Sequence, residues 1–137
     1  MTYIPDALRQ EVIKRAKGRC EYCLLHQDDN LFPHEIDHII AEKHHGETIS
    51  DNLCLSCLDC NRHKGSDLTS IDLETGDVVV LFHPRRDRWE DHFKLESATI
   101  VPLTNKGRVT VFLLDMNAEE QIAKRAGLIE LGRYPTP

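Results

Sequence analysis

The apolar residues near the N-terminus recur with the period of an α-helix, at Leu8, Val12 and Ala16. Proline is favoured in the first turn of a helix, and glycine is favoured just after the last turn. Pro5 and Gly18 occupy such positions. The pattern therefore predicts a helix over residues 5–17.

Shorter apolar runs follow in the middle of the chain. Residues 32–40 carry three isoleucines and predict a short strand that leads into a polar loop over residues 41–51. A second short strand is predicted at residues 53–55. Residues 58–64 predict a short helix, which Gly65 would end.

The C-terminal half predicts mostly strands. Residues 71–81 have the pattern of a hairpin with its turn near Gly76. Residues 99–101 and 108–114 predict two further strands, joined by a turn at residues 105–107.

A last helix is predicted after these strands. Asn117 and Glu120 stand three residues apart, as in a capping box, so the helix would run from there through Arg125 and close at Gly127. Residues 133–137 are expected to form a tail.

The composition is that of one globular domain. The chain has 137 residues, of which 40% are hydrophobic and 29% charged. No apolar run approaches the roughly 18 residues that a membrane span needs, and residues 1–15 lack the apolar stretch of a secretory signal. We therefore expect a cytoplasmic protein without a membrane partner, in which thiols stay reduced.

The charge narrows the possible functions. The formal net charge is −6 at pH 7. Proteins that coat nucleic acid are basic, because their binding depends on neutralising phosphates. The acidic balance argues against such a protein, but it leaves a nuclease open, because local patches and a divalent cation can meet the phosphate.

Four of the five cysteines form two couples, Cys20-x-x-Cys23 and Cys57-x-x-Cys60. A two-residue gap lets both sulfurs of a couple reach one ion, and four thiolates suit tetrahedral Zn²⁺. With no position left for water, such a zinc would be structural. Two disulfides or four free thiols are the alternatives. Cys54 lies between two leucines and is expected to be buried in the second short strand.

Between the couples, an acid and a histidine stand side by side, at Asp37 and His38. On a regular strand their side chains point to opposite faces, but at a strand end or bend both can reach one cavity. A carboxylate binds hard divalent cations, and a neutral imidazole takes a proton from water near pH 7. The pair therefore suits phosphodiester hydrolysis, with a surface pair of no special role as the alternative.

Two asparagines add to this chemistry. Asn61 directly follows Cys60 at the start of the short helix, where its amide oxygen would be either a hard metal ligand or a helix cap. Asn52 precedes the second strand and by itself has the properties of a turn residue.

From the acid–histidine pair to the short helix, the order and spacing of residues form one motif. It consists of Glu35-Ile36-Asp37-His38-Ile39-Ile40, a loop with Gly46, and Asn52-Leu53-x-Leu55-x-Cys57-x-x-Cys60-Asn61-x-x-Lys64. This motif closely resembles the HNH endonuclease family, and more narrowly its zinc-containing members with two C-x-x-C couples.

The resemblance implies a fold. It predicts an α+β protein whose ββα-metal, treble-clef-like core is stapled by the four-cysteine zinc and holds one catalytic divalent ion. We expect an N-terminal helix before this core and a β-rich C-terminal extension that ends in a helix. The expected organisation is a single domain over residues 1–137, with the HNH core at about 19–65 and the extension at about 66–137.

The resemblance also implies roles for site residues. His38 would be the general base that activates water, and Asn52 would orient the loop and hold that base. Asn61 takes the place of the final histidine, which makes the chain an HNN variant. Asp37 and Asn61 would bind the catalytic ion. Two protein ligands completed by water and phosphate oxygens suit Mg²⁺ or Mn²⁺.

Four basic residues are candidate contacts to nucleic-acid phosphates: Arg62 and Lys64 on the short helix, and Arg85 and Arg86 in a basic–aromatic segment. A solvated helix face is the alternative for the first pair. In the same segment Trp89 and Phe93 stand at helical spacing, so they suit either base stacking or the core.

The sequence thus predicts a metal-dependent HNH endonuclease that hydrolyses DNA. One ββα site cuts one strand, so double-strand cleavage would need a homodimer or two visits. The alternative is a non-catalytic zinc-stabilised module that binds nucleic acid or a protein.

Overall fold

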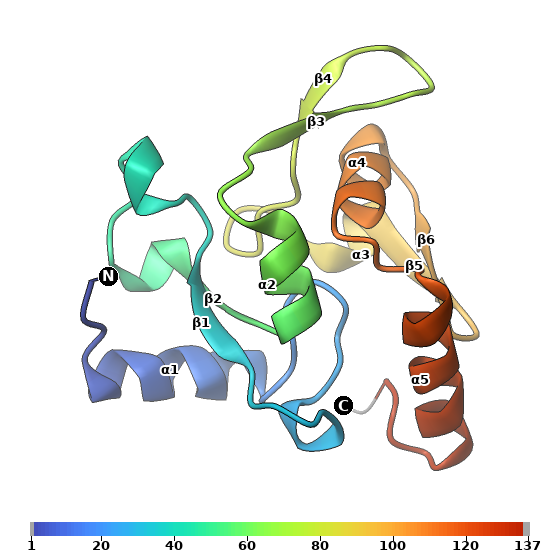
Figure 1. The fold of residues 1–137 in the computed structure, drawn as a ribbon, viewed down its shortest axis with the longest axis horizontal. Coiled ribbons are helices and arrows are strands. Elements are labelled where there is room, and N and C mark those ends of the chain that lie inside the picture. The colour runs from blue at the N-terminus through green and yellow to red at the C-terminus, as the bar shows by residue number, and fades with distance from the viewer. Residues whose placement is uncertain (1, 136–137) are drawn as a thin grey trace. The chain divides into compact units, whose positions relative to one another are not determined.

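The computed structural model describes residues 2–135, which form an α+β protein with small antiparallel sheets (Figure 1). The predicted fold class is confirmed. The chain divides into two compact units, with the boundary between Ser66 and Asp67. The single domain expected from the length stays a prediction. Within the described residues, no helix has the length and apolar character that crossing a membrane requires.

The first unit contains a helix, a two-stranded sheet and a second helix. The helix α1 (Asp6–Ala16) comes first, and β1 (Glu35–His38) pairs antiparallel with β2 (Leu53–Ser56). The helix α2 (Leu58–Lys64) follows β2 after a single residue, Cys57. All four elements were predicted at these places. Short 3₁₀ turns lie at Gln27–Asp29, Glu42–His44 and Ser50–Asn52.

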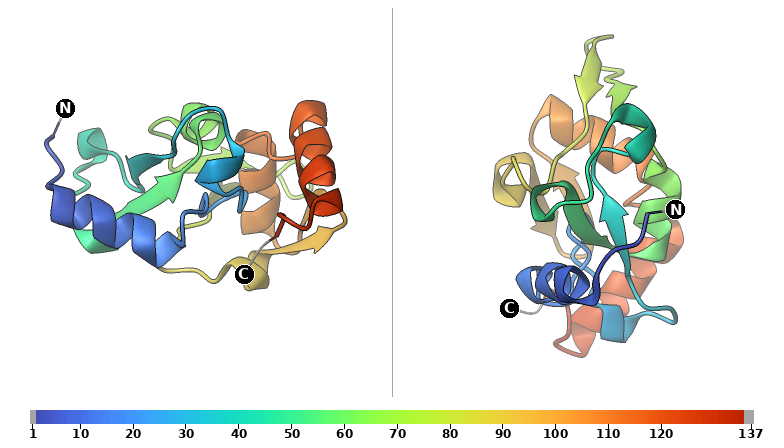
Figure 2. Two further views of the ribbon diagram at one scale, coloured as in Figure 1. Left: turned by 90° about the horizontal axis from the view of Figure 1, so that it is seen from below. Right: turned by 90° about the vertical axis from the view of Figure 1, so that its left-hand side faces the viewer.

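The two helices cover opposite faces of this sheet, as the left view of Figure 2 shows. Because side chains alternate along a strand, Leu53 and Leu55 face α1 and pack with Val12 in an apolar core. The register places Asp37 opposite Cys54, on the other face, and His38 opposite Leu53. Asp37 and His38 therefore leave the strand on opposite faces, and His38 is its last residue.

In the second unit, residues 67–135 form two hairpins and three helices. The strands β3 (Thr69–Ile71) and β4 (Val78–Val80) form the predicted hairpin, and β5 (Phe93–Glu96) pairs with β6 (Thr99–Pro102). The helices are α3 (Trp89–His92), α4 (Asn105–Leu113) and α5 (Glu119–Glu130). The buried apolar residues of this unit include Phe82, Phe93, Ile100, Val109, Leu114 and Met116.

The strand predicted at residues 108–114 is wrong, because this segment forms most of α4. Its β-branched residues favour a strand locally, but the Thr104 hydroxyl caps a helix by accepting a hydrogen bond from the Gly107 amide at 3.1 Å. Gly107 was predicted in a turn and instead allows a close approach, since a Cβ there would lie 2.3 Å from the carbonyl oxygen of His92. The C-terminal extension is therefore less β-rich than predicted.

The capping box predicted at Asn117 is also wrong. The Asn117 amide instead pairs with both backbone groups of Ile100, accepting at 3.0 Å and donating at 2.7 Å. The helix α5 starts after Ala118 without a side-chain cap, and it continues through Gly127 to Glu130. A terminal helix was predicted correctly, but the hydrogen bonds of Asn117 to Ile100 accompany a later start, and the helix ends three residues beyond Gly127. Of the expected tail, residues 136–137 lie outside the described residues.

Candidate functional site

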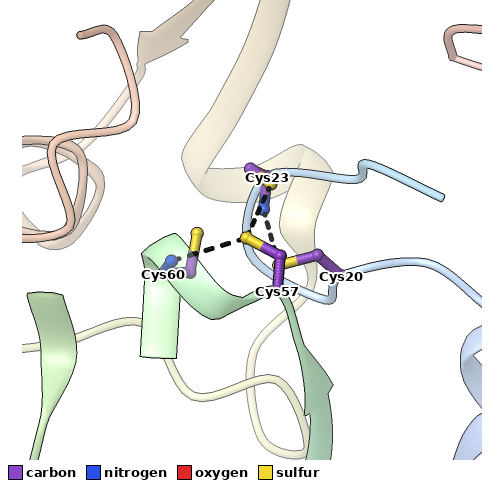
Figure 3. Close-up of side chains that lie close together, drawn as sticks. All are labelled: Cys20, Cys23, Cys57 and Cys60. Carbon is purple, nitrogen blue, oxygen red and sulfur yellow. Dashed lines mark hydrogen bonds between the residues drawn. The ribbon is translucent and has the colours of Figure 1, made fainter. Parts of the chain in front are cut away.

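The four paired cysteines converge in the first unit, as Figure 3 shows. Their sulfurs all lie within 4.8 Å of one another, and all four residues are buried. The sulfurs of Cys23 and Cys57 are 3.7 Å apart. A disulfide would need about 2.05 Å, whereas a tetrahedral zinc with ligands at about 2.3 Å separates its sulfurs by about 3.8 Å. All five cysteines of the chain are free thiols, so the disulfide alternative does not hold in this structure.

Local backbone structure positions each couple. Around the first couple, the amide of Cys20 donates to the carbonyl oxygen of Leu25 at 2.8 Å and closes a tight turn. The second couple is part of a helix start, because Cys57 is the N-cap of α2 and its sulfur accepts from the Cys60 amide at 3.4 Å. The Cys23 amide points at the Cys20 sulfur in the same way, at 3.5 Å. Amides directed at sulfur stabilise thiolates, the form that binds metal.

The charges in this cluster favour a bound cation. Burial opposes ionisation of Cys20, but hydrogen bonds from the other three thiols lower its pKa. Hydrogen bonding to Cys20 raises the pKa of Cys23 and Cys60 well above the ordinary value, and burial adds to this. A soft divalent cation compensates four thiolates, so the residues fit zinc.

Asp37 faces α2 and lies beside a buried lysine. Its Oδ2 atom is 3.6 Å from the Nζ atom of Lys64, and the two side chains are 15% and 2% exposed. Both atoms are buried, and neither makes a hydrogen bond. Burial raises the pKa of Asp37, although the Lys64 ammonium opposes this rise. A buried carboxylate oxygen without a donor is unusual in a folded protein and is a candidate cation ligand.

Asn61 lies one helical turn before Lys64, on the same side of α2. Its amide nitrogen donates to the Oε2 atom of Glu35 at 2.6 Å. Glu35 and Asp37 stand two apart on β1 and therefore share a face. The Asn61 oxygen is left available as a ligand beside that face. The structure thus brings Asp37 and Asn61 to the same face of the sheet, as the predicted shared ion requires.

His38 is held at the end of β1 by the loop that follows. Its Nε2 atom lies 2.9 Å from the hydroxyl oxygen of Thr48. When Nε2 carries the proton and donates it to Thr48, Nδ1 keeps its lone pair as the basic atom. Thr48 was not singled out in the sequence, because a threonine in a polar loop gives no periodic or motif signal.

Asn52 fixes the same loop. Its side chain accepts from the amide of Ile40 and donates to the carbonyl oxygens of Ile40 and Glu47, each at 2.9 Å. Gly46 passes so close that a Cβ there would lie 1.7 Å from the Ile40 oxygen. Asn52 therefore holds the loop one residue before Thr48, which in turn contacts His38. The loop-orienting role of Asn52 stays a prediction.

The basic residues are placed unevenly. Arg62 is exposed on α2, whereas Lys64 is buried against Asp37 and does not present its ammonium to solvent. In the second unit Arg86 is exposed and Arg85 is half-buried. The ring centroids of Trp89 and Phe93 are 5.1 Å apart and Phe93 is buried, so Phe93 belongs to the core.

Two strands, a helix and a buried four-cysteine cluster define the first unit as a zinc-type ββα unit. Residues 20–67 match the model of the HNH endonuclease family, which confirms the family that the motif resembled. With four cysteines placed for a zinc site, the segment is consistent with the zinc-binding members. No curated protein and no solved structure matches the chain. The HNH match indicates a nuclease-type, nucleic-acid-related function.

Proposed function

We propose that this protein is a metal-dependent endonuclease that hydrolyses DNA phosphodiester bonds, acting in the cytoplasm. The observation that carries the proposal is the Asp37 oxygen, which is buried without a hydrogen bond on the face that also bears Asn61. It lies inside the segment that matches the HNH family. A purely structural zinc module has no need of a buried carboxylate oxygen without a hydrogen-bond donor, next in sequence to a histidine.

In this proposal two separate groups of residues hold the catalytic ion and the structural zinc. Asp37 and Asn61 hold a divalent cation, Mg²⁺ or Mn²⁺, through one carboxylate and one amide oxygen. That ion supplies positive charge to the phosphate and to the leaving oxygen. The buried cysteine cluster holds Zn²⁺ and keeps α2 against the sheet, so that Asn61 stays beside Asp37.

His38 is the general base. With Nε2 donating to Thr48, its Nδ1 atom accepts the proton of the attacking water as the new O–P bond forms. Asn52 keeps this arrangement by tying the loop to Ile40 and Glu47. The imidazole is therefore aimed before substrate arrives, which lowers the cost of reaching the transition state.

DNA is the expected partner. Arg62 is an exposed candidate phosphate contact beside Asn61, and Arg85 and Arg86 are candidates in the second unit. Lys64 is buried, so a phosphate contact from it would require a different side-chain conformation. A homodimer is proposed only for double-strand cleavage, because a single site cuts one strand.

The test is cleavage of supercoiled plasmid by the purified chain with Mg²⁺ or Mn²⁺, and its loss on adding EDTA. His38→Ala should lower the cleavage rate by at least about 10²-fold, as expected for loss of a general base. Zinc content and thermal stability should stay at the parent values. His44→Ala, an exposed histidine of the same loop, is the matched control and should cut like the parent.

Two outcomes would contradict the proposal. Full activity in a clean preparation of His38→Ala would remove the base from the mechanism. Absence of EDTA-sensitive cleavage in the parent, with one zinc bound per chain, would favour the non-catalytic zinc module instead.

A further inference from the structure

The facing surfaces of β1 and α2 carry two matched pairs of polar side chains. Glu35 and Asp37 share a face because strand side chains repeat every two residues, and Asn61 and Lys64 share a face because helix neighbours stand three or four apart. The Oε2 atom of Glu35 lies 2.6 Å from the Nδ2 atom of Asn61. The Oδ2 atom of Asp37 lies 3.6 Å from the Nζ atom of Lys64. The first pair is a hydrogen bond, whereas the second is an ion pair without one.

The direction of the first hydrogen bond is what matters for the site. A carboxylate has acceptors only, so Glu35 binds the NH₂ end of the Asn61 amide and never its oxygen. Metal cations bind the oxygen end of an amide. An asparagine without such a partner flips its amide freely and presents nitrogen to the ion in part of the population.

We propose that Glu35 is a positioning residue that fixes the Asn61 amide with its oxygen presented as a metal ligand. The inference rests on the proposed function, in which Asn61 binds the catalytic ion. It assigns a task to an exposed acid that the expected mechanism does not use. Glu35 acts through Asn61 and touches neither the ion nor the substrate.

Two other roles for Glu35 make different predictions. If Glu35 were itself a metal ligand, its negative charge would be essential, and Glu35→Gln would weaken the metal site. If Glu35 only fastened α2 to β1, its loss would lower stability and zinc retention. As a positioning residue, it needs only an acceptor oxygen facing Asn61, which glutamine also supplies.

The first experiment measures Mn²⁺ binding to the full zinc-loaded chain by electron paramagnetic resonance of the free ion. Partners that orient a ligand typically contribute 10- to 100-fold to affinity, so Glu35→Ala should weaken Mn²⁺ binding by about tenfold or more. Glu35→Gln should bind within about twofold of the parent. Zinc content and melting temperature should be unchanged in both variants, which separates positioning from fastening.

The second experiment exchanges the hydrogen-bond donor and acceptor between residues 35 and 61. Asn61→Asp alone places a carboxylate against Glu35, and the repulsion should turn the new ligand away and weaken Mn²⁺ binding by about tenfold. Adding Glu35→Gln lets the glutamine NH₂ donate to the new aspartate, so the double variant should bind better than Asn61→Asp alone. Equal binding by the single and double variants would overturn the positioning role.

Failure of this inference and failure of the proposed function give different results. If the parent binds Mn²⁺ and cuts plasmid while Glu35→Ala is unchanged, Glu35 has no positioning role and the nuclease stands. If Glu35→Gln is as weak as Glu35→Ala, Glu35 is a charged ligand and the inference is wrong. If the parent neither binds Mn²⁺ nor cuts DNA, the proposed function fails together with the role of Glu35.

Discussion

The two units of this chain are stabilised in different ways. The first unit has a small apolar core of Ile4, Val12, Leu53 and Leu55, and it adds a buried four-cysteine cluster. The second unit has no such cluster among its described residues and instead buries large apolar side chains from both β5–β6 and α4. Small cores stabilise a fold weakly, so a metal staple is expected in the first unit and not in the second.

The two units also differ in how their buried polar groups are paired. In the first unit the cluster includes Cys57 and Cys60 at the start of α2, and the Asp37 oxygen that faces this helix is buried without a hydrogen bond. In the second unit the buried charged residues Asp72 and Arg125 both make hydrogen bonds: Asp72 accepts from Arg108 at 2.8 Å, and Arg125 donates to the Ala98 carbonyl oxygen at 2.7 Å. Unsatisfied polar atoms mark functional sites more often than structural ones, so the Asp37 oxygen supports the site proposed in the first unit.

The largest expected effect is loss of the metal. Structural zinc contributes about 10 kcal/mol or more to the folding of small metal-binding domains, which is comparable to the whole stability of a domain. Cys60→Ser, or removal of zinc by a chelator, should therefore unfold the first unit while the second keeps its own core. Hydrogen exchange followed by mass spectrometry should show fast exchange before Ser66 and retained protection after it.

Cys54→Ala is the matched control for this prediction. Cys54 is also fully buried on β2, but its sulfur lies near the Tyr22 hydroxyl and outside the cluster. Its loss should cost about 1 kcal/mol and leave one zinc per chain. Equal unfolding of both units in Cys60→Ser would contradict the separate stabilisation of the two units.

Replacing a glycine by alanine is expected to have a smaller effect on stability. The substitution should destabilise the first unit and stabilise the second. Gly46→Ala in the first unit would push a methyl group onto the Ile40 carbonyl and the Asn52 amide, at a cost of about 2 kcal/mol. Asn52 bonds the loop at Glu47, and Thr48 contacts His38, so the proposed cleavage activity should also fall. Gly127→Ala in α5 meets nothing within 4 Å and should stabilise the second unit by about 0.5–1 kcal/mol. Thermal denaturation of both variants measures whether the melting temperature falls for Gly46→Ala and rises for Gly127→Ala.

The secondary structure of the first unit was predicted from the sequence more accurately than that of the second unit. In the first unit β1, β2 and α2 were all placed correctly, because the cysteine spacing and the motif around Asp37 constrain the backbone locally. In the second unit Val109 and Val111 suggested a strand, but Thr104 caps a helix there and Gly107 packs closely against His92. That close approach joins residues distant in sequence, so no local pattern carries it.

The candidate site shows the same limit at the level of side chains. Asp37, His38, Asn52 and Asn61 were predicted as site residues from type and spacing, but the side chains that contact them in the structure were not predicted. Thr48 lies in an irregular loop whose path depends on Asn52. The burial of Lys64 follows from how α2 packs on β1, whereas the spacing of Glu35 and Asp37 on one strand already placed them on one face.

A pH-dependent effect is expected in the β3–β4 hairpin. Hydrogen bonds from Arg108, the shorter at 2.8 Å, lower the pKa of Asp72 below its usual value. A carboxyl group with a lowered folded-state pKa stabilises the protein above its unfolded-state pKa, and this stabilisation is lost as the pH falls through the folded-state value. Asp72→Asn should therefore be less stable than the parent at pH 7, and the difference should shrink below about pH 4.

Urea denaturation from pH 3 to pH 7 measures this difference, with Asp77→Asn as the control in the same hairpin. Asp77 is exposed, and its substitution should change stability little at any of these pH values. A difference between Asp72→Asn and the parent that stays constant down to pH 3 would show that the carboxylate charge does not stabilise the hairpin. Zinc content should be unaffected, because Asp72 lies in the second unit.

The smallest expected effect is a change in DNA affinity when a single arginine of the second unit is replaced. Arg86 is exposed in the second unit and is a candidate phosphate contact. If it makes one such contact, Arg86→Ala should weaken binding about equally for all sequences and reduce the slope of log affinity against log salt by about 1. Lys94→Ala, an exposed cation on β5, controls for net charge alone. An equal change of slope in both variants would mean that the second unit contributes only a diffuse field, leaving specific phosphate contacts to the first unit.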